Sequence, residues 1–596
     1  MSESRQTAGQ PDPVGRLLLG LAAVAVAFAA ADTYVVVLAL PEMMAASGLS
    51  AEQLQEGAPI ISGFLLGYIG VLPLVGRIAD LRGRIPVLVG SMLVFAVGSM
   101  VTASAYDLGS MVAGRVLQGI GGGGLFPATL ALVADLYPPR RRGIPLGIVN
   151  GVQEFGNVVG PLYGAVVLAF GTWRDIFWIN LAGGLVLAAV IRRRGLTERA
   201  LSGAARGVVR RRVDWLSLGL LLGFLVAVLL VMLQPPRLTE DVTLGAVFVP
   251  VVGSSRWLAP LALLGLGLFV LVLVRGVLAP APLFDLRGWR DLLRRIDVLG
   301  ATLLSLALAG VIIAFASADP EVQVFSPAGP WLLLGSAVAA YLFWRRNAAV
   351  DNPLLPSGTL RATPAWGAMV VSFFAGAALI AALVDIPIFA RITVYGESQL
   401  LAALVLVRFL VGLPAGALLG GWLTHRAPAG LVTAVGMALS AAGFLMMTQW
   451  GLDTLHDPWA TVPLVLGGTG IGLAIPPVNA ALLASTHGDV HGVASALLLV
   501  SRTVGKLVGI SALTTIGLRV YYRKQADLPA PQDVCPGGQS RCSEFAHLLR
   551  VNGLVELHTI FLGAAVCCVI AGVVALAVFR HADTREIDTP ALGGVG

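Results

Sequence analysis

The sequence predicts an all-α membrane protein, because it is too apolar for water and its apolar residues fall in long runs. Hydrophobic residues make up 57% of the 596 residues and charged residues only 12%, and the mean hydropathy is +0.85. A helix crosses a bilayer core about 30 Å thick with roughly 20 apolar residues, and runs of this length recur from residue 17 to residue 579. Such runs are too long for the strands of a β-barrel, and only helices satisfy their backbone within one segment in lipid.

Sixteen apolar runs are long enough to cross a membrane, and fourteen spans are the alternative count. Six runs fall within residues 17–192, four within 193–360 and six within 361–580. This grouping predicts two six-helix bundles with four inserted helices between them. The predicted spans are 17–40, 58–77, 86–104, 109–133, 144–169, 175–192, 213–233, 258–279, 296–316, 330–347, 365–388, 400–421, 428–449, 460–485, 492–518 and 558–579.

The charge of successive loops alternates, and this alternation predicts the orientation of the chain. Every second loop is rich in arginine, as at residues 77–84, 140–142 and 192–212, whereas the loops between are acidic or neutral. Because basic loops remain in the cytoplasm, we expect both termini to be cytoplasmic. The net charge of +7 is therefore explained by membrane topology, and nucleic acid is not an expected partner. The basic outer segment 519–557 is the exception.

The middle of the chain suggests a duplicated hairpin. Residues 213–285 and 296–358 each begin with an aspartate at a helix entry, Asp214 and Asp297, and each ends in a Pro-Leu segment. The alternative is that any two apolar hairpins look alike. Residues 193–360 are thus expected to hold a cytoplasmic linker and the inserted helices.

Three segments are expected to lie outside the membrane: a disordered N-terminus at 1–16, an outer loop at 519–557 and a C-terminal tail at 581–596. The outer loop contains Cys535 and Cys542, seven residues apart. Because the outer face is oxidising, we expect a disulfide between them; two free thiols are the alternative.

Several short motifs carry information about mechanism. The loop GRIADLRGRI (Gly76 to Ile85) has Gly76 and Gly83 for a tight turn and close helix approach, and Asp80 and Arg84 for a charged contact. Such a contact acts as a conformational latch when it forms in one state and breaks in another. In GNVVGPLYG, Gly156, Gly160 and Gly164 share one helix face, so a neighbouring helix can pack closely, and Pro161 bends the helix.

These stretches, together with GRVLQG around Arg115, ADTYVVVLALP and WRDIFWIN, resemble the drug:proton antiporter branch of the major facilitator superfamily that has extra helices. The sequence of these motifs is most similar to that of a mycobacterial subgroup of multidrug and triacylglycerol lipid exporters. The resemblance implies a major facilitator fold in a bacterial inner (plasma) membrane and a proton-coupled exporter of hydrophobic compounds, lipids such as triacylglycerols and/or drugs. It also implies a periplasmic lipoprotein partner and no cofactor. The second-half loop GGWLTHR resembles a degenerate latch, with Thr424 where an Asp is expected.

Charged residues inside spans are costly and are candidates for function. By the resemblance, Asp32 and Glu154 are the proton-coupling carboxylates and Arg115 is their partner. Burial favours the neutral carboxyl and a nearby arginine favours the charged one, so conformation could control protonation. The alternative is a static ion-pair network.

The second half contains four further charged candidates. Asp385 and Arg408 lie on consecutive spans and are expected to pair. Arg502 and Lys506 share one helix face, where they would contact anionic head groups or extend toward the membrane interface.

Two other classes of function remain open from the sequence, a lipid-modifying membrane enzyme and a passive channel. His487 and His491 lie together but only Asp489 accompanies them. Gly119, Gly121 and Gly124 spell G-x-G-x-x-G inside an apolar span, where a nucleotide fingerprint has no meaning without a preceding strand. No zinc-spaced cysteine pair or other metal motif is present, so we expect neither a metal nor an enzyme.

Overall fold

The computed structural model describes residues 13–49, 57, 59–138, 142–201, 214–241, 243–280, 282–316, 326–350, 353–355, 361–395, 399–487, 490–535, 542–582 and 584. Within these ranges the chain is helical and has no strand, which confirms the all-α prediction. The first half contains α1 (Pro13–Ala46), α3 (Pro59–Arg82), α4 (Arg84–Ala103), α5 (Leu108–Leu136), α6 (Gly143–Phe170) and α7 (Trp173–Leu201). The inserted part contains α8 (Trp215–Leu233), α9 (Pro236–Thr239), α10 (Pro260–Leu278), α11 (Leu286–Arg295), α12 (Val298–Ala316) and α13 (Gly329–Ala349). The second half contains α14 (Thr363–Ile392), α15 (Gln399–Leu423), α16 (Ala429–Met447), α17 (Thr461–Ala484), α18 (His491–Ala526), α19 (Pro531–Val534) and α20 (Ser543–Val578).

Each of the sixteen predicted spans coincides with a long helix in the described ranges. Fourteen stretches of the described residues are long and apolar enough to cross a membrane. Helices α6 and α13 are not among them. In α13 the arginines Arg345 and Arg346 lie near the end of the helix and lower its hydropathy. The choice between fourteen and sixteen spans therefore stays a prediction.

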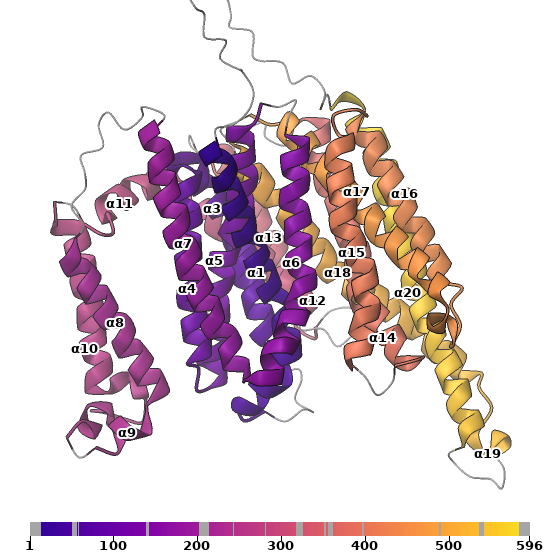
Figure 1. Cartoon of the computed structure of the whole chain (residues 1–596), viewed down its shortest axis with the longest axis horizontal. Coiled ribbons are helices and arrows are strands. Elements are labelled where there is room, and N and C mark those ends of the chain that lie inside the picture. The colour runs from indigo at the N-terminus through magenta and orange to yellow at the C-terminus, as the bar shows by residue number, and fades with distance from the viewer. Residues whose placement is uncertain are drawn as a thin grey trace, which may run out of the picture.

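The two halves lie side by side, with the first half on the left of the C-terminal half in Figure 1. The second half has its own core, centred on Phe389, Phe444 and Phe561. The core of the first half includes Phe64, Phe95 and the inner face of α12. Arginines gather at the end of the first half that carries Arg84, Arg142 and residues 192–194, and we call this end of the molecule the basic face. Helices α9 and α19 lie at the opposite face (Figure 1).

The two inserted hairpins, α8–α10 and α12–α13, repeat one local arrangement. Asp214 caps α8, accepting from the Ser217 backbone N–H (3.1 Å), and pairs with Arg275 at the end of α10 (2.8 Å). Asp297 likewise caps α12 through Gly300 N (2.9 Å) and pairs with Arg346 at the end of α13 (2.7 Å). The matched capping and pairing supports the duplication hypothesis.

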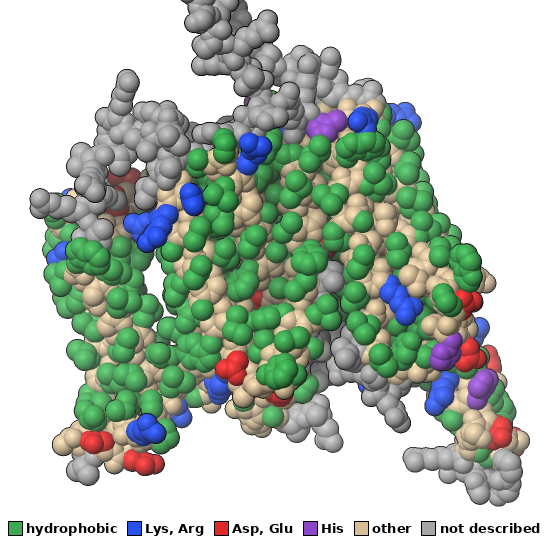
Figure 2. Space-filling model, viewed as in Figure 1, with side chains coloured by type: hydrophobic (Ala, Val, Ile, Leu, Met, Phe, Trp, Pro, Cys, Tyr) green, Lys and Arg blue, Asp and Glu red, His purple; other side chains and the backbone are tan. Residues whose placement is uncertain are grey.

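The two hairpins occupy different places. The α8–α10 hairpin stands beside the first half, and Figure 2 shows an opening between it and the main body. Its contact near the opposite face is made by Tyr106, whose hydroxyl accepts from Trp257 Nε1 (3.0 Å) and whose ring lies 4.2 Å from the Arg256 guanidinium. The α12–α13 hairpin instead packs against both α3 and α18, behind the junction of the halves in Figure 1.

Two segments predicted as non-helical contain helix, and the location of residues 519–557 outside the membrane stays a prediction. The expected outer loop 519–557 is largely helical, because α18 and α20 each run for 36 residues and leave residues 527–542 as the connection between them. The polar residues in these extensions lower hydropathy without breaking a helix, so a hydropathy pattern underestimates helix length. The expected disordered segment 1–16 is helical from Pro13 onward, while residues 1–12 lie outside the described ranges. Cys535 and Cys542 form a disulfide (S–S 2.07 Å) beside α19.

Candidate transport site

The charged loop between α3 and α4 joins the two halves at the basic face. The buried Asp80 carboxylate accepts hydrogen bonds from the backbone N–H groups of Gly492 (3.1 Å) and Val493 (3.3 Å) at the start of α18. Asp80 also pairs with Arg84, which contacts Asp135 Oδ2 as well (3.2 Å). A carboxylate at a helix N-terminus satisfies free N–H groups and the positive end of the helix dipole.

Two glycines allow this contact to form. A Cβ on Gly76 would lie 2.7 Å from the Gly492 carbonyl oxygen, so any side chain there would push α3 and α18 apart. Gly83 has φ +90°, in the left-handed region that favours glycine, and it reverses the chain between α3 and α4. The residues of the predicted latch thus lie together, and the contact they make is between halves.

A second set of contacts closes the basic face between α6 and the second half. Gly143 and Gly147 pack against Gly421 and Ala417 of α15. A Cβ added to Gly143 would lie 2.6 Å from the Gly421 carbonyl oxygen, and one added to Gly147 would lie 2.8 Å from the Ala417 carbonyl oxygen. Thr424, at the position of the degenerate latch, is buried and donates to Gly420 O of its own helix (2.6 Å). The loop after α15 therefore contributes no carboxylate contact through this residue.

Asn150 of α6 and Asn479 of α17 form a buried hydrogen bond between the halves, with Asn479 Nδ2 donating to Asn150 Oδ1 (2.9 Å). Asn479 Oδ1 has no hydrogen-bond partner among the described residues. This pair was not predictable from the sequence, because no sequence motif indicates which asparagines face the other half.

We expect Asn479→Leu to favour opening of the basic face about fivefold, since a buried hydrogen bond contributes about 1 kcal/mol net. Alkylation of a cysteine that replaces Thr424 would measure the opening, because this side chain is buried at the basic face beside Arg142 and Gly143. Asn552→Leu is the matched control: Asn552 is also buried, but it bonds Tyr521 O within the same half (3.4 Å). Equal alkylation rates for the Asn479 variant and the unchanged protein would contradict the prediction.

Asp32 lies at the centre of a buried polar network inside the first half. Its carboxylate pairs with Arg115 (2.6 Å) and accepts hydrogen bonds from Asn180 (2.5 Å) and Gln118 (3.4 Å). Arg115 is fully buried, its guanidinium lying 4.5 Å from the Phe64 ring and its Nε donating to Ile60 O (3.3 Å). The sequence prediction that Asp32 and Arg115 act together is consistent with this ion pair, and Asn180 is a partner that the sequence did not identify.

The glycines of the α6 motif hold this helix against α1. A Cβ on Gly156 would collide with Ala27 O, one on Gly160 with Ala31 O, and one on Gly164 with Val35 Cγ2. Asp32 follows directly after Ala31, so the motif positions the helix that carries the carboxylate next to the helix that carries Glu154. The side chain of Pro161 lies outside the described residues.

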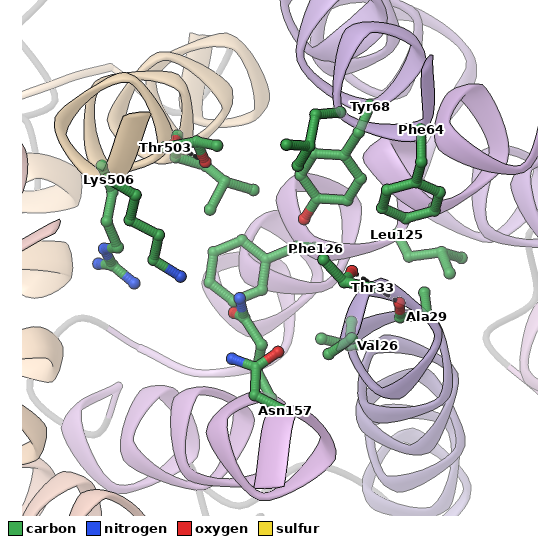
Figure 3. Close-up of a pocket in the computed structure, with 16 residues that line it drawn as sticks. Val26, Ala29, Thr33, Phe64, Tyr68, Leu125, Phe126, Asn157, Thr503 and Lys506 are labelled. Carbon is green, nitrogen blue, oxygen red and sulfur yellow. Dashed lines mark hydrogen bonds between the residues drawn. The ribbon is translucent and has the colours of Figure 1, made fainter. Parts of the chain in front are cut away.

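A small cavity, open at its mouth, lies between the first half and α18. Its apolar and aromatic wall comes from α1, α3 and α5 and includes Val26, Phe64 and Phe126. Its polar wall includes Gln153, Asn157, Tyr68, Arg502 and Lys506. In Figure 3 Tyr68, Asn157 and Lys506 point into the same central space from different helices.

Glu154 of α6 and Arg502 of α18 belong to different halves, and Arg502 lines the cavity. Glu154 is 2% exposed and accepts from Asn157 Nδ2 of its own helix (2.8 Å). Arg502 is 3% exposed, and its Nε and Nη1 have no hydrogen-bond partner among the described residues. The two side chains are close enough for their charges to interact. Two opposite charges on separate halves are thus brought together without a direct ion pair.

The structure places the other charged candidates of the second half differently from expectation. Arg408 donates to Thr461 Oγ1 (3.3 Å) and does not pair with Asp385. Asp385 is buried near Glu556 of α20 instead. Arg502 lines the cavity and does not extend toward a membrane interface, because its position on α18 faces the first half.

The alternatives of an enzyme or metal site find no support in the described residues. No group of three or more metal-binding side chains occurs among them. The ring of His491 lies within 3.1 Å of the backbone carbonyls of Leu483 and Thr486, so a structural role accounts for it. Gly119, Gly121 and Gly124 are buried packing positions in α5.

Two six-helix halves, a mainly apolar cavity with a few polar groups and contacts between the halves at one face define a multi-pass membrane transporter and not an enzyme. The chain belongs to the Major Facilitator Superfamily, whose model matches residues 22–344. Relatives named triacylglyceride transporter are 33% identical in Mycolicibacterium hassiacum (96% of this chain, 93% of the relative) and 32% identical in Mycolicibacterium smegmatis (97% and 91%). The human organic anion transporter MFSD10 has the same fold, with a TM-score of 0.54 and 13% identity over 95% of this chain and all of that one.

Proposed function

We propose that this chain exports hydrophobic compounds, lipids of the triacylglycerol class foremost, by proton-coupled alternating access. The observation that carries the proposal is that Glu154 and Arg502 lie on separate halves, close enough for their charges to interact, with Arg502 lining the cavity. A carboxyl group whose distance to an arginine depends on how the halves are oriented has a proton affinity that changes with conformation. That dependence is the physical requirement for coupling.

Asp32 is the second proposed proton-coupling group. Its partners Arg115, Asn180 and Gln118 all lie in the first half, so its surroundings depend on movements within that half. Glu154 has its hydrogen-bond partner on its own helix. Its charge interacts with the second half through Arg502. In this proposal the closed basic face is one end state of the transport cycle.

The cavity favours apolar cargo. Its wall from α1, α3 and α5 carries aliphatic and aromatic side chains, and its polar groups are confined mainly to α6 and α18. The names of the mycobacterial relatives point in the same direction. Drugs of similar hydrophobic character remain within the proposed range of cargo.

The proposed orientation places the basic face in the cytoplasm and the disulfide outside the plasma membrane, with both termini cytoplasmic. Helices of 36 residues are about 54 Å long at 1.5 Å per residue, well beyond a hydrocarbon core of about 30 Å. The ends of α18 and α20 therefore extend past the bundle at the opposite face (Figure 1). This extension is where a periplasmic lipoprotein would receive cargo.

Asp32→Asn and Glu154→Gln test the proposal, since both substitutions preserve shape and remove a titratable group. We expect each to reduce proton-driven lipid transport in reconstituted vesicles at least tenfold. Asp107→Asn is the control, because Asp107 is an exposed carboxylate that caps α5. Full coupling in both variants would overturn the assigned roles, and lipid movement that is independent of the proton gradient would indicate a passive channel.

A further inference from the structure

The charged side chains that line the cavity all have the same sign. Among the described residues of its lining, Arg502 and Lys506 are basic and none is an aspartate or a glutamate. The two basic residues are four positions apart on α18, so they lie on one face of this helix, one turn from each other. Lys506 points into the central space between the helices (Figure 3). A lining with two positive charges and no negative one attracts an anion and disfavours a cation.

Arg502 has hydrogen-bonding capacity that the protein itself does not use. Its side chain is 3% exposed, and its Nε and Nη1 have no hydrogen-bond partner among the described residues. Glu154 offsets part of its charge from the first half, but the two groups form no direct ion pair, so these N–H groups still lack an acceptor. Buried donors without a partner are unfavourable. An oxygen atom supplied by a ligand would satisfy them.

Arg115 shows how the same chain satisfies an arginine that has a structural partner. It is also fully buried, but its Nε donates to Ile60 O (3.3 Å) and its Nη1 donates to Asp32 (2.6 Å). The equivalent two nitrogens are the ones left open in Arg502. A guanidinium group presents its donors as a planar fork that matches the two oxygens of a carboxylate or phosphate. The open donors of Arg502 therefore fit an anionic group of this kind.

The rest of the cavity is suited to a hydrocarbon chain. Its wall from α1, α3 and α5 includes Val26, Phe64 and Leu125, and in Figure 3 these side chains lie across the central space from Lys506. Burying an apolar chain against such a wall is favourable in proportion to the area removed from water. Basic groups on one side and apolar groups on the other together match an amphipathic anion.

We propose that this cavity binds the anionic head group of a lipid, a carboxylate or a phosphate, at Arg502 with Lys506 beside it, and that the attached acyl chain lies against the wall from α1, α3 and α5. This inference rests on the proposed export of hydrophobic compounds, and it adds amphipathic anions to the neutral lipids named there. A triacylglycerol offers ester oxygens as acceptors but no charge to pair with Arg502.

Competition photolabelling of the full chain in dodecyl maltoside micelles tests the head-group site. The probe is palmitate with a diazirine in its acyl chain, and the readout is labelling of residues 122–130, which include the cavity positions Leu125 and Phe126. Palmitate, hexadecyl phosphate, methyl palmitate and hexadecyltrimethylammonium are the competitors in separate arms. The first two distinguish a carboxylate from a phosphate, the third removes the charge, and the fourth inverts it.

We expect palmitate, hexadecyl phosphate or both to displace the probe at a concentration about tenfold lower than methyl palmitate, because hydrogen bonds between charged groups are the strong ones. Arg502→Gln is expected to abolish this preference, whereas Arg502→Lys, which keeps the charge but not the planar fork, retains part of it. Arg408→Gln is the matched control and leaves the preference unchanged, because Arg408 donates to Thr461 in the same half and does not line the cavity. Thermal unfolding in the same detergent checks that each variant is folded.

Equal competition by palmitate and methyl palmitate in the unchanged protein overturns the inference, and so does stronger competition by hexadecyltrimethylammonium; neither result depends on a variant that folds. A preference for anions that persists in folded Arg502→Gln overturns the role of this arginine. Proton-driven triacylglycerol transport in vesicles is measured separately. Coupled transport without any preference for anions refutes this inference alone, whereas an intact preference with transport that is independent of the proton gradient refutes the proposed function alone.

Discussion

Arg115→Met is expected to destabilise the protein by about 3–5 kcal/mol, because it leaves a buried carboxylate without its countercharge. Arg115 is fully buried and its ion pair with Asp32 is 2.6 Å long. The remaining partners, Asn180 and Gln118, are neutral and replace only part of the lost interaction. Chemical unfolding in detergent micelles would measure the loss, and we expect transport to fall with it.

The double variant Asp32→Asn/Arg115→Met separates a structural role of this pair from a role in coupling. Removing both charges leaves no buried charge without a partner, so we expect most of the stability to return. If Asp32 carries a proton, transport stays absent in the stable double variant. Recovery of proton-driven transport together with stability would establish the static ion-pair network and refute the coupling role of Asp32.

The sequence was sufficient to predict the helices, because long apolar runs and membrane thickness together determine them. It also indicated residues that form short-range contacts, such as Asp80 with Arg84 and Cys535 with Cys542. Family motifs marked Asp32, Arg115 and Glu154, whose burial follows from their position within apolar spans.

Contacts between segments distant in sequence were not predictable in the same way. Arg502 and Lys506 share a helix face, but the sequence does not state whether this face meets lipid or the other half. Asp385 and Arg408 lie on consecutive helices, yet a rotation about either helix axis separates them, and Arg408 bonds Thr461 instead. Hydropathy likewise failed at the extensions of α18 and α20, since polar residues lengthen a helix beyond the membrane without any apolar signal.

Asp80→Asn is expected to shift the protein strongly toward states with an open basic face. The carboxylate accepts two backbone hydrogen bonds from the start of α18 and carries the charge that pairs with Arg84. Hydrogen bonds to a charged group contribute about 1.5–3 kcal/mol, which corresponds to a shift of roughly 10- to 150-fold. Spin labels at Ile144→Cys and Trp422→Cys, exposed positions on α6 and α15, would report the separation as a longer distance population.

Asp135→Asn provides the matched comparison, because Asp135 contacts the same arginine without bridging the halves. Its carboxylate is 3.2 Å from Arg84 Nε, its side chain is 50% exposed, and it belongs to α5 of the first half. An exposed ion pair contributes about 0–1 kcal/mol, so the distance distribution should move little. Equal shifts in the two variants would mean that Asp80 holds the basic face closed through its ion pair with Arg84 and not through its hydrogen bonds with the start of α18. A distribution unchanged by Asp80→Asn would show that the glycine contacts and the Asn150–Asn479 bond hold the basic face closed without the latch.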